Sequence, residues 1–239
     1  MIVAIAGQKG GVGKSTIAIC LSAESGERGR RALLVDADPQ GTTRTWGELA
    51  TETAERSLWM PTIVAMGETM HRPDQLPRLA AGFDDVLIDC PPRHGGVQRS
   101  ALMVADLALL PCGPSAADAW ALASSIELVQ EARTLRPDLL AAVVITRKKG
   151  RTALGKGARQ MLEEGGLPVL AAELGDRISY QEALAAGLGV SRYAPRDAAG
   201  REVRALFDEL AAFVGANHAA TEKADREPPK AAARRTRRR

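Results

Sequence analysis

Short apolar runs alternate along the chain with longer stretches of helical periodicity. The apolar runs are rich in Val, Ile and Leu and contain few polar residues, which is typical of strands buried on both faces of a parallel sheet. We therefore predict strands at residues 2–6, 31–36, 85–89, 106–111 and 139–146, with weaker candidates near 62–65 and 168–171.

Helical periodicity fills most of the stretches between these runs. Strands that alternate with helices are connected by βαβ crossovers, so the pattern predicts an α/β protein. We expect a doubly wound, mostly parallel sheet with helices on both faces. In residues 41–82, Thr, Glu and Pro blur the periodicity, and no helix is predicted there. The predicted helices lie at about 14–28, 96–104, 115–134, 151–165, 176–186 and 199–216.

The composition fits one globular domain of this class. Of the 239 residues, 45% are hydrophobic and 26% are charged, as in ordinary globular proteins. The three cysteines, Cys20, Cys90 and Cys112, form no CxxC pair, so neither a zinc site nor a disulfide framework is indicated. No apolar run approaches the roughly 20 residues that span a bilayer. We expect a cytoplasmic protein.

The positive charge is concentrated at the C-terminus. Residues 223–239 hold eight basic and two acidic residues, a net charge of +6, whereas the whole chain carries +3. The rest of the chain is therefore negative. This last segment is rich in Arg, Ala and Pro and offers no apolar face, so it is predicted to be disordered. We expect a folded domain over residues 1–217 and a disordered basic tail over 218–239.

A glycine-rich loop follows the first predicted strand and precedes the first predicted helix. Its sequence is GQKGGVGKST, residues 7–16. Glycines let backbone N–H groups turn inward around phosphates, and the helix N-terminus adds its dipole. The usual GxxxxGK[ST] pattern requires glycine at position 8, where this chain has Gln8, so the loop is a variant with an additional lysine, Lys9. The expected nucleotide-binding residues are Gly10, Gly11, Val12, Gly13, Lys14, Ser15 and Thr16, with Lys14 on the β- and γ-phosphates and Ser15 on Mg²⁺.

Carboxylates follow two other predicted strands. Asp89 ends an apolar strand, as the Mg²⁺-supporting acid of Walker B sequences does. Asp36 and Asp38 end a second strand, and alternation places both on the same side of the chain. One of this pair would support the metal and the other would orient the attacking water. Because ligands of doubly wound sheets bind beyond the carboxyl ends of the strands, all three acids are site candidates.

Three motifs together resemble those of the ParA/MinD family of deviant Walker ATPases. They are KGGVGKS at 9–15, LLVDADPQG at 33–41 and VLIDCPP at 86–92, and the likeness extends over roughly residues 1–215. The resemblance implies a P-loop NTPase fold and a homodimer formed in the ATP state. It also implies weak intrinsic ATP hydrolysis that a partner protein and DNA stimulate. The phosphate loop begins within ten residues of Met1, as in the small ParA proteins, which have no N-terminal helix-turn-helix.

The resemblance also implies roles for individual residues. In that family the additional lysine of the loop, here Lys9, reaches the phosphates of the partner subunit. A lysine supplied in trans neutralises charge that develops on the γ-phosphate oxygens. Lys9, Lys14 and Asp38 would then be the catalytic residues. Mg²⁺ would be supported by Ser15, Asp36 and Asp89, and the adenine pocket would include Thr146 and Arg147.

ParA proteins bind DNA nonspecifically as ATP dimers, so exposed basic residues become DNA-binding candidates through phosphate neutralisation. The expected function is a nucleoid-associated, bacterial or plasmid-encoded ATPase that segregates or positions a cargo. The cargo would be a plasmid or chromosome partition complex, a chemoreceptor cluster or a carboxysome, and a cargo-bound or centromere-binding protein would activate hydrolysis. The DNA-binding candidates are Lys148, Lys149, Arg151, Arg177, Arg201, Arg204, Arg234, Arg235, Arg237, Arg238 and Arg239, beside the further bases Lys156, Arg159, Arg192 and Arg196.

Other functions stay open at this point. A membrane-cycling division regulator of the MinD type requires an amphipathic C-terminal helix, whereas the tail offers only alanines and prolines beside its arginines. An iron–sulfur branch requires a second cysteine near Cys112. A metabolic P-loop enzyme would need an acceptor pocket that the sequence does not display. A nonhydrolytic, nucleotide-gated interaction module is the remaining alternative.

Overall fold

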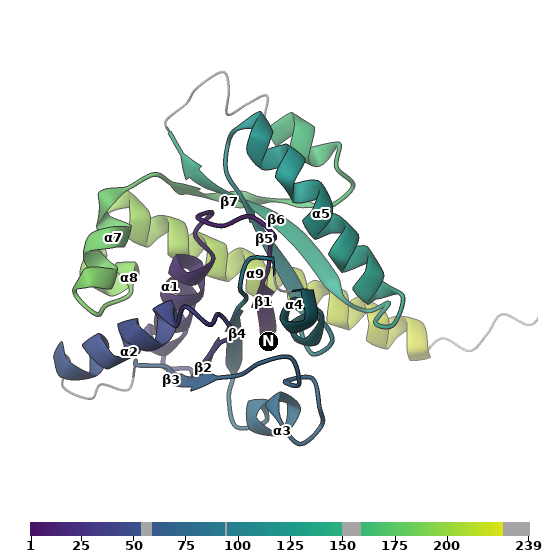
Figure 1. Ribbon diagram of the computed structural model, residues 1–239, viewed down its shortest axis with the longest axis horizontal. Helices are drawn as coiled ribbons and strands as arrows, with labels where there is room; N and C mark the ends of the chain where they lie inside the picture. Colours follow the sequence, from purple (N-terminus) through teal and green to yellow (C-terminus); the bar gives the residue numbers. More distant parts are fainter. Residues whose placement is uncertain (54–58, 94, 150–158, 227–239) are drawn as a thin grey trace, which may run out of the picture.

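The structure is a computed structural model that describes residues 1–53, 59–93, 95–149 and 159–226. Its centre is a seven-stranded sheet in the order β3-β2-β4-β1-β5-β6-β7, and every pairing is parallel (Figure 1). This confirms the predicted fold class and all seven predicted strand positions. The strands are β1 (Ile2–Ile5), β2 (Ala32–Asp36), β3 (Thr62–Ala65), β4 (Asp85–Asp89), β5 (Leu107–Cys112), β6 (Leu140–Lys148) and β7 (Val169–Gly175).

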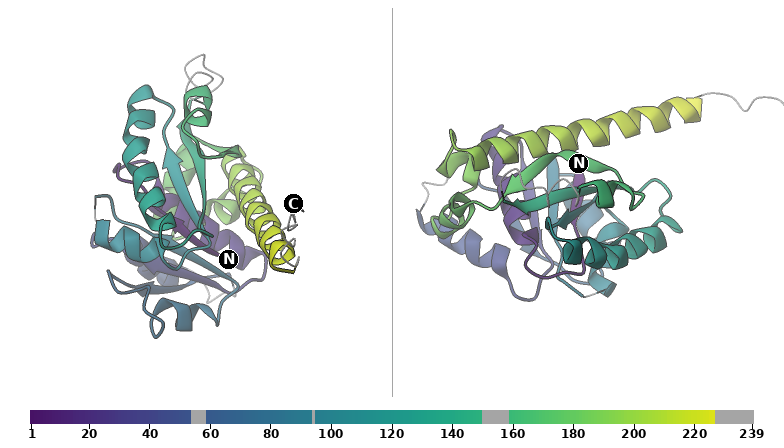
Figure 2. Two further views of the ribbon diagram at one scale, coloured as in Figure 1. Left: turned by 90° about the vertical axis from the view of Figure 1, so that its right-hand side faces the viewer. Right: turned by 90° about the horizontal axis from the view of Figure 1, so that it is seen from above.

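Helices cover both faces of the sheet, as Figure 2 shows from two sides. Because successive strand residues point to opposite faces, each face has its own hydrophobic cluster: Val3 and Ile5 belong to one, and Ala4 to the other. The first cluster is covered by α1 (Lys14–Glu27), α2 (Thr42–Thr53), α7 (Ile178–Ala185), α8 (Val190–Tyr193) and α9 (Ala198–Arg226). The second is covered by α3 (Leu76–Ala80), α4 (Gly95–Leu102), α5 (Ala116–Arg133) and the helical residues 159–163.

Helix α2 lies in the region where no helix was predicted. It is amphipathic, and it buries Trp46 and Ala50 in the same cluster as helix α1. Packing against the sheet thus stabilises a helix whose Thr-rich sequence has low intrinsic propensity. The short helices α3 and α8 were also missed. Of the helix predicted over 151–165, residues 151–158 lie outside the described residues.

Helix α9 continues beyond the expected end of the folded domain. It runs to Arg226, so the predicted boundary between residues 217 and 218 falls inside a helix. The last part of the predicted tail, residues 227–239, lies outside the described residues. No helix within the described ranges is both long enough and apolar enough to cross a membrane.

Helix α9 protects one edge of the sheet. Glu209 accepts hydrogen bonds from the backbone N–H groups of Ala171 and Ala172 in β7, each at 2.7 Å. Glu202 accepts another from the N–H of Gly175 at 3.0 Å. These carboxylates occupy donors that an edge strand otherwise presents to other chains. They also fix α9 beside the carboxyl end of β7, next to the site described below.

Candidate nucleotide-binding site

The phosphate loop joins β1, near the middle of the sheet, to helix α1. Gly11 and Gly13 have φ values of 75° and 95°, a left-handed conformation that strains residues with a side chain. The first hydrogen bond of α1 runs from the N–H of Ile17 to the carbonyl of Gly13 at 2.9 Å. The N–H groups of residues 14–16 precede this bond and form the open first turn of the helix. The loop therefore has the anion-binding geometry expected of it.

Lys14 lies inside the loop. It is only 7% exposed, and its Nζ donates to the carbonyl of Lys9 at 2.9 Å. Burial lowers the pKa of Lys14, whereas the charges of Asp89 and Asp38 act in the opposite direction. A buried ammonium held by one carbonyl retains donors for a polyanion. The contact between Lys14 and the β- and γ-phosphates stays a prediction.

Asp89 carries two buried oxygens without a hydrogen-bond partner. Burial raises the pKa of Asp89 to about 7, and the charges of Asp36 and Asp38 raise it too, while Ser15 and Lys14 act against the rise. Buried orphan carboxylate oxygens are costly unless a cation or its water shell satisfies them. The environment of Asp89 thus fits a Mg²⁺ site.

Asp36 differs from Asp89, because its oxygens already accept hydrogen bonds from the chain. Oδ1 accepts from the N–H of Asp38 at 3.1 Å, and Oδ2 accepts from the N–H of Arg44 at 3.0 Å. Asp36 therefore holds the start of α2 in place. The half-buried Asp38 accepts one bond from the N–H of Gln40 at 2.9 Å, which shapes the connection between β2 and α2.

Within the described ranges, no group of three or more His, Cys, Asp or Glu side chains is arranged to hold a metal. This does not conflict with a nucleotide-linked Mg²⁺, which takes most of its ligands from phosphates and water and few from the protein. Ser15 and Asp89 are the residues that would hold such an ion. Asp36 would support these two residues.

Lys9 lies on the outer side of the loop. Its ammonium forms an ion pair with Asp118 of α5, and the Lys9 side chain remains 41% exposed. Asp118 also accepts from the N–H of Ser115, and the Ser115 hydroxyl accepts from the N–H of Asp118, a reciprocal cap of α5. Burial opposes ionisation of Asp118, but hydrogen bonds from Lys9 and Ser115 prevail and lower its pKa. The two lysines of the loop thus occupy different places, one inside and one outside.

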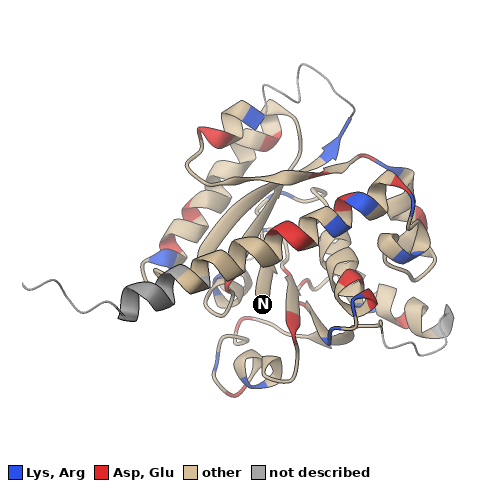
Figure 3. Cartoon of the chain, turned by 180° about the vertical axis from the view of Figure 1, so that it is seen from behind, with Lys and Arg blue, Asp and Glu red and all other residues tan. Residues whose placement is uncertain are grey.

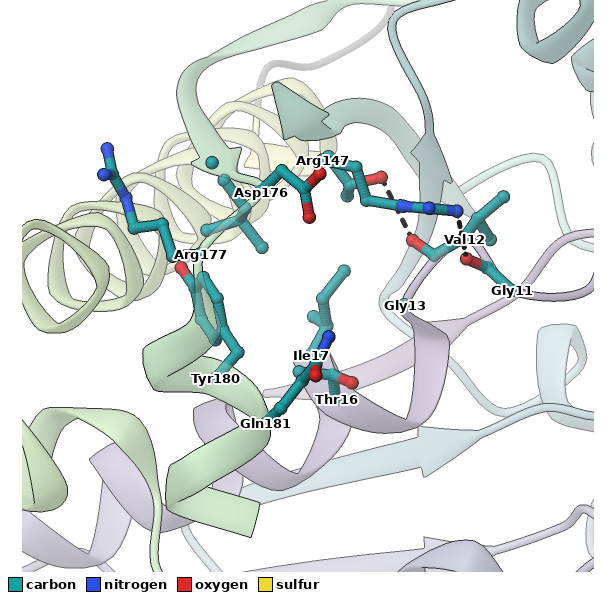
Figure 4. A pocket seen from close by; sticks show the side chains of 13 residues that line it. Gly11, Val12, Gly13, Thr16, Ile17, Arg147, Asp176, Arg177, Tyr180 and Gln181 are labelled. Carbon is teal, nitrogen blue, oxygen red and sulfur yellow. Dashed lines mark hydrogen bonds between the residues drawn. The ribbon is translucent and has the colours of Figure 1, made fainter. Parts of the chain in front are cut away.

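A cavity of about 310 Å³ opens beside the loop (Figure 4). Thr146 and Arg147, the predicted adenine-pocket residues, lie in its wall and bind the loop: the Thr146 hydroxyl donates to the carbonyl of Val12 at 3.0 Å, and Arg147 Nη1 donates to that of Gly11 at 3.2 Å. The opposite wall comes from the end of β7 and from α7. Its residues, which sequence reasoning did not assign to the site, are Leu174, Gly175, Asp176, Tyr180 and Gln181, together with Arg177.

The structure separates the predicted DNA-binding residues into groups. Lys148 pairs with Glu173, Lys149 lies 3.7 Å from Asp176, and Arg177 is bound by Glu202 at the cavity. In contrast, Arg201 and Arg204 form no salt bridge with a carboxylate of the described residues; their guanidinium groups donate to backbone carbonyls near the start of α9. Figure 3 shows Lys and Arg positions in blue along the first turns of this helix. The remaining candidates, Arg151, Arg234, Arg235, Arg237, Arg238 and Arg239, lie outside the described residues.

Comparisons with known proteins agree with this geometry. Residues 3–190 match the family described as the CobQ/CobB/MinD/ParA nucleotide binding domain. The chain is 33% identical over 210 residues to the maintenance of carboxysome distribution protein A of Halothiobacillus neapolitanus, covering 87% of this chain and 94% of that protein. It is 28% identical to the chromosome-partitioning ATPase Soj of Thermus thermophilus, covering 89% and 96%. The structure of a Cyanothece McdA–ATP complex has the same fold, with a TM-score of 0.72 at 19% identity, covering 90% of this chain and 96% of that one. The chain therefore belongs to the ParA/MinD family of nucleotide-binding proteins.

Proposed function

We propose that this protein is a Mg²⁺-dependent ATPase that dimerises when it binds ATP, holds DNA without sequence preference and positions a cargo. The observation that carries the proposal is the placement of two lysines by one phosphate loop. Lys14 is buried within the loop, and Lys9 lies outside it, 41% exposed. Lys14 serves the nucleotide of its own chain, whereas Lys9 is positioned for a ligand outside its own loop.

The residues of the loop divide the work of phosphoryl transfer. The open turn at residues 14–16 and the ammonium of Lys14 bind the phosphates. Ser15 and Asp89 would hold Mg²⁺, which would neutralise phosphate charge. Asp38, half-buried at the end of β2, orients the attacking water. Lys9 of the partner chain adds positive charge as the γ-phosphate departs, in the manner of an arginine finger. Since this lysine arrives only with a second chain, hydrolysis depends on the dimer.

DNA binding in this proposal rests on bases that form no salt bridge with a carboxylate of the described residues. Arg201 and Arg204, on successive turns at the start of α9, are the described candidates of this kind. An arginine already paired with a carboxylate must break that pair before it binds a phosphate, so it releases fewer counterions per contact. The basic residues beyond Arg226 would add to the same electrostatic attraction.

The relatives indicate the kind of cargo. One is named for maintaining carboxysome distribution, and another for partitioning chromosomes. We propose that the protein is cytoplasmic, associates with the nucleoid and positions its cargo through a cargo-bound activator. As the cargo, we favour a carboxysome over a centromere complex. The basis is the relative that is 33% identical and of which this chain covers 94%.

The test measures the mass of the full chain in solution. Size-exclusion chromatography with light scattering, in Mg²⁺ with ATP, should give twice the 25.3 kDa of one chain, whereas ADP should leave a monomer. Only the ATP sample should be retained on random-sequence duplex DNA, and anionic phospholipid vesicles should not retain it. Retention on vesicles in place of DNA would favour a membrane-cycling regulator of the MinD type. A monomer in every nucleotide would contradict the proposal.

A further inference from the structure

One carboxylate outside the cavity binds three of the residues that form its wall. Glu202, near the start of α9, accepts hydrogen bonds on Oε2 from the N–H of Gly175 at 3.0 Å and from the hydroxyl of Tyr180 at 3.1 Å. Its Oε1 accepts from Nε and Nη2 of Arg177, at 2.9 and 2.6 Å. Gly175, Arg177 and Tyr180 all line the cavity, whereas Glu202 does not.

The three donors come from different parts of the fold. Gly175 ends β7, Arg177 lies in the connection that follows, and Tyr180 belongs to α7. Burial, and then the charge of Glu202, raise the pKa of Tyr180 above its ordinary value, so the phenol keeps its proton and remains a donor. The hydrogen bonds to Glu202 raise the pKa of Arg177. A single carboxylate thus joins a strand end, a connection and a helix into one wall.

We propose that Glu202 is a positioning residue for nucleotide binding. Through Arg177 and Tyr180, it fixes the position of the cavity wall that contacts the base and the ribose. This inference rests on the proposed function, because it takes the cavity to receive the nucleoside part of ATP. The phosphates bind on the other side of this cavity, at the loop of residues 10–16. Loss of Glu202 should therefore weaken the binding of a nucleotide but not the binding of a polyphosphate that has no base.

The chain provides a matched control on the same helix. Glu209 lies two turns after Glu202, and it also uses both oxygens to bind N–H groups of β7, those of Ala171 and Ala172. Neither of these residues lines the cavity. Replacing Glu209 by Gln therefore disturbs the contact between α9 and β7 to a similar degree without touching the wall.

The substitution Glu202→Gln creates a specific conflict. A glutamine side chain has one acceptor oxygen and one NH₂ donor. If its oxygen faces Arg177, the NH₂ group meets the N–H of Gly175; if it is turned round, the NH₂ group meets the guanidinium of Arg177. In both orientations two donors oppose each other, and the wall must shift.

The experiment compares two ligands on three proteins. Isothermal titration calorimetry with Mg²⁺–ATP and with tripolyphosphate is carried out on the wild-type chain, Glu202→Gln and Glu209→Gln. We expect Glu202→Gln to weaken the binding of ATP about tenfold and that of tripolyphosphate less than about twofold. The reason is that displacing hydrogen-bonding groups of the cavity wall costs roughly a factor of ten in affinity. Glu209→Gln should change neither affinity by more than about twofold. Thermal melting of both variants checks that they fold. Should Glu202→Gln fail to fold, Arg177→Gln, at a side chain that is 39% exposed, takes its place with the same expected pattern.

Two results would overturn this inference but not the proposed function. One is that Glu202→Gln weakens the binding of ATP and of tripolyphosphate equally. The other is that Glu202→Gln binds ATP with the same affinity as Glu209→Gln. A wild-type chain that binds neither ligand would overturn the proposed function as well, so the two failures are distinguishable.

Discussion

The ammonium group of Lys9 and the carboxylate of Asp118 form an ion pair within a single chain, between the phosphate loop and the first turn of α5. If Lys9 is to reach the phosphates of a partner chain, as we propose, this ion pair must open. Asp118 and the partner's nucleotide therefore compete for the same ammonium. The pair is partly exposed, so it is weak enough to be displaced by a triphosphate.

Replacing Asp118 by Asn should make dimerisation easier. The asparagine oxygen can still accept from the N–H of Ser115, while the charge that holds Lys9 is lost. We expect half-maximal dimerisation at an ATP concentration about two- to fivefold lower, in keeping with a partly exposed ion pair. The measurement is a titration of ATP monitored by light scattering.

Ser115→Ala serves as the control for that substitution. It removes the hydroxyl cap of α5 and should cost about 1 kcal/mol of stability, but it leaves the carboxylate on Lys9. Its dimerisation midpoint should match that of the wild-type chain. A midpoint lowered equally in both variants would show that loosening of α5, and not release of Lys9, explains the effect.

Lys14 and Asp38 should separate binding from hydrolysis. Lys14→Ala removes the buried ammonium from the loop and should abolish measurable ATP binding. Asp38→Asn keeps the hydrogen bond to the N–H of Gln40 and should bind ATP within about twofold of wild type, yet turn it over about 100-fold more slowly. Filter binding and a phosphate-release assay measure the two quantities. Turnover by Asp38→Asn at the wild-type rate would show that our assignment of the water-orienting acid is wrong.

Arg201 and Arg204 on α9, which form no salt bridge with the residues that the structure describes, should contribute directly to DNA binding. The double substitution Arg201→Ala with Arg204→Ala should reduce the slope of log affinity against log salt by about two, one for each lost phosphate contact. Lys148→Ala should leave the slope unchanged, because Lys148 is already paired with Glu173. Fluorescence anisotropy on random-sequence duplex DNA in ATP provides the slopes. Equal slopes for the double variant and the wild-type chain would place the DNA contacts elsewhere.

Asp85 lies at the end of the sheet opposite the phosphate loop, and it should make the stability of the fold depend on pH. Its buried carboxylate accepts from Ser25 at 2.6 Å and from Arg30 at 2.6 and 3.0 Å. Burial opposes ionisation, but these donors prevail and lower the pKa of Asp85. Since the pKa in the folded chain lies below that in the unfolded chain, the contribution is complete above about pH 4 and is lost as the pH falls through the folded value.

Asp85→Asn should therefore lower the free energy of unfolding by about 2 kcal/mol at neutral pH, because the buried carboxylate that accepts from Ser25 and Arg30 is lost, whereas Arg30, 44% exposed, is then solvated by water. The difference from wild type should stay constant from about pH 5 to 8 and shrink below about pH 4. The exposed neighbour Asp84 is the control, and Asp84→Asn should change the free energy of unfolding much less than Asp85→Asn does. Urea unfolding at several pH values measures both; a difference that grows toward acid pH would contradict the assignment.

The sheet and the phosphate loop could be predicted from the sequence for one physical reason. Parallel strands end at the same edge, so Asp36 and Asp89, 53 residues apart in the chain, are brought to the loop by the topology alone. Helix α2 could not be predicted, because packing of Trp46 against other elements stabilises it more than its own sequence does.

Contacts between side chains that are far apart in the chain could not be predicted from the sequence either. Lys9 and Asp118 are 109 residues apart, and Glu202 meets Arg177 only because α9 covers the edge of β7. Likewise, the sequence marked Lys148 and Arg201 alike as basic, whereas Lys148 pairs with Glu173 and Arg201 forms no salt bridge within the described part of the chain. Such distinctions arise from tertiary contacts between side chains.

A mixing experiment tests the central claim most directly, that the additional lysine acts on the nucleotide of the other chain. Lys9→Ala can bind ATP but offers no lysine to a partner, and Lys14→Ala offers Lys9 but binds no ATP. Neither variant alone should hydrolyse ATP appreciably. If Lys9 acts in trans, mixing them should yield heterodimers with one complete site, and ATP turnover should rise well above the sum of the two separate rates. A mixed rate equal to that sum, measured at concentrations where chemical crosslinking demonstrates heterodimers, would contradict the account.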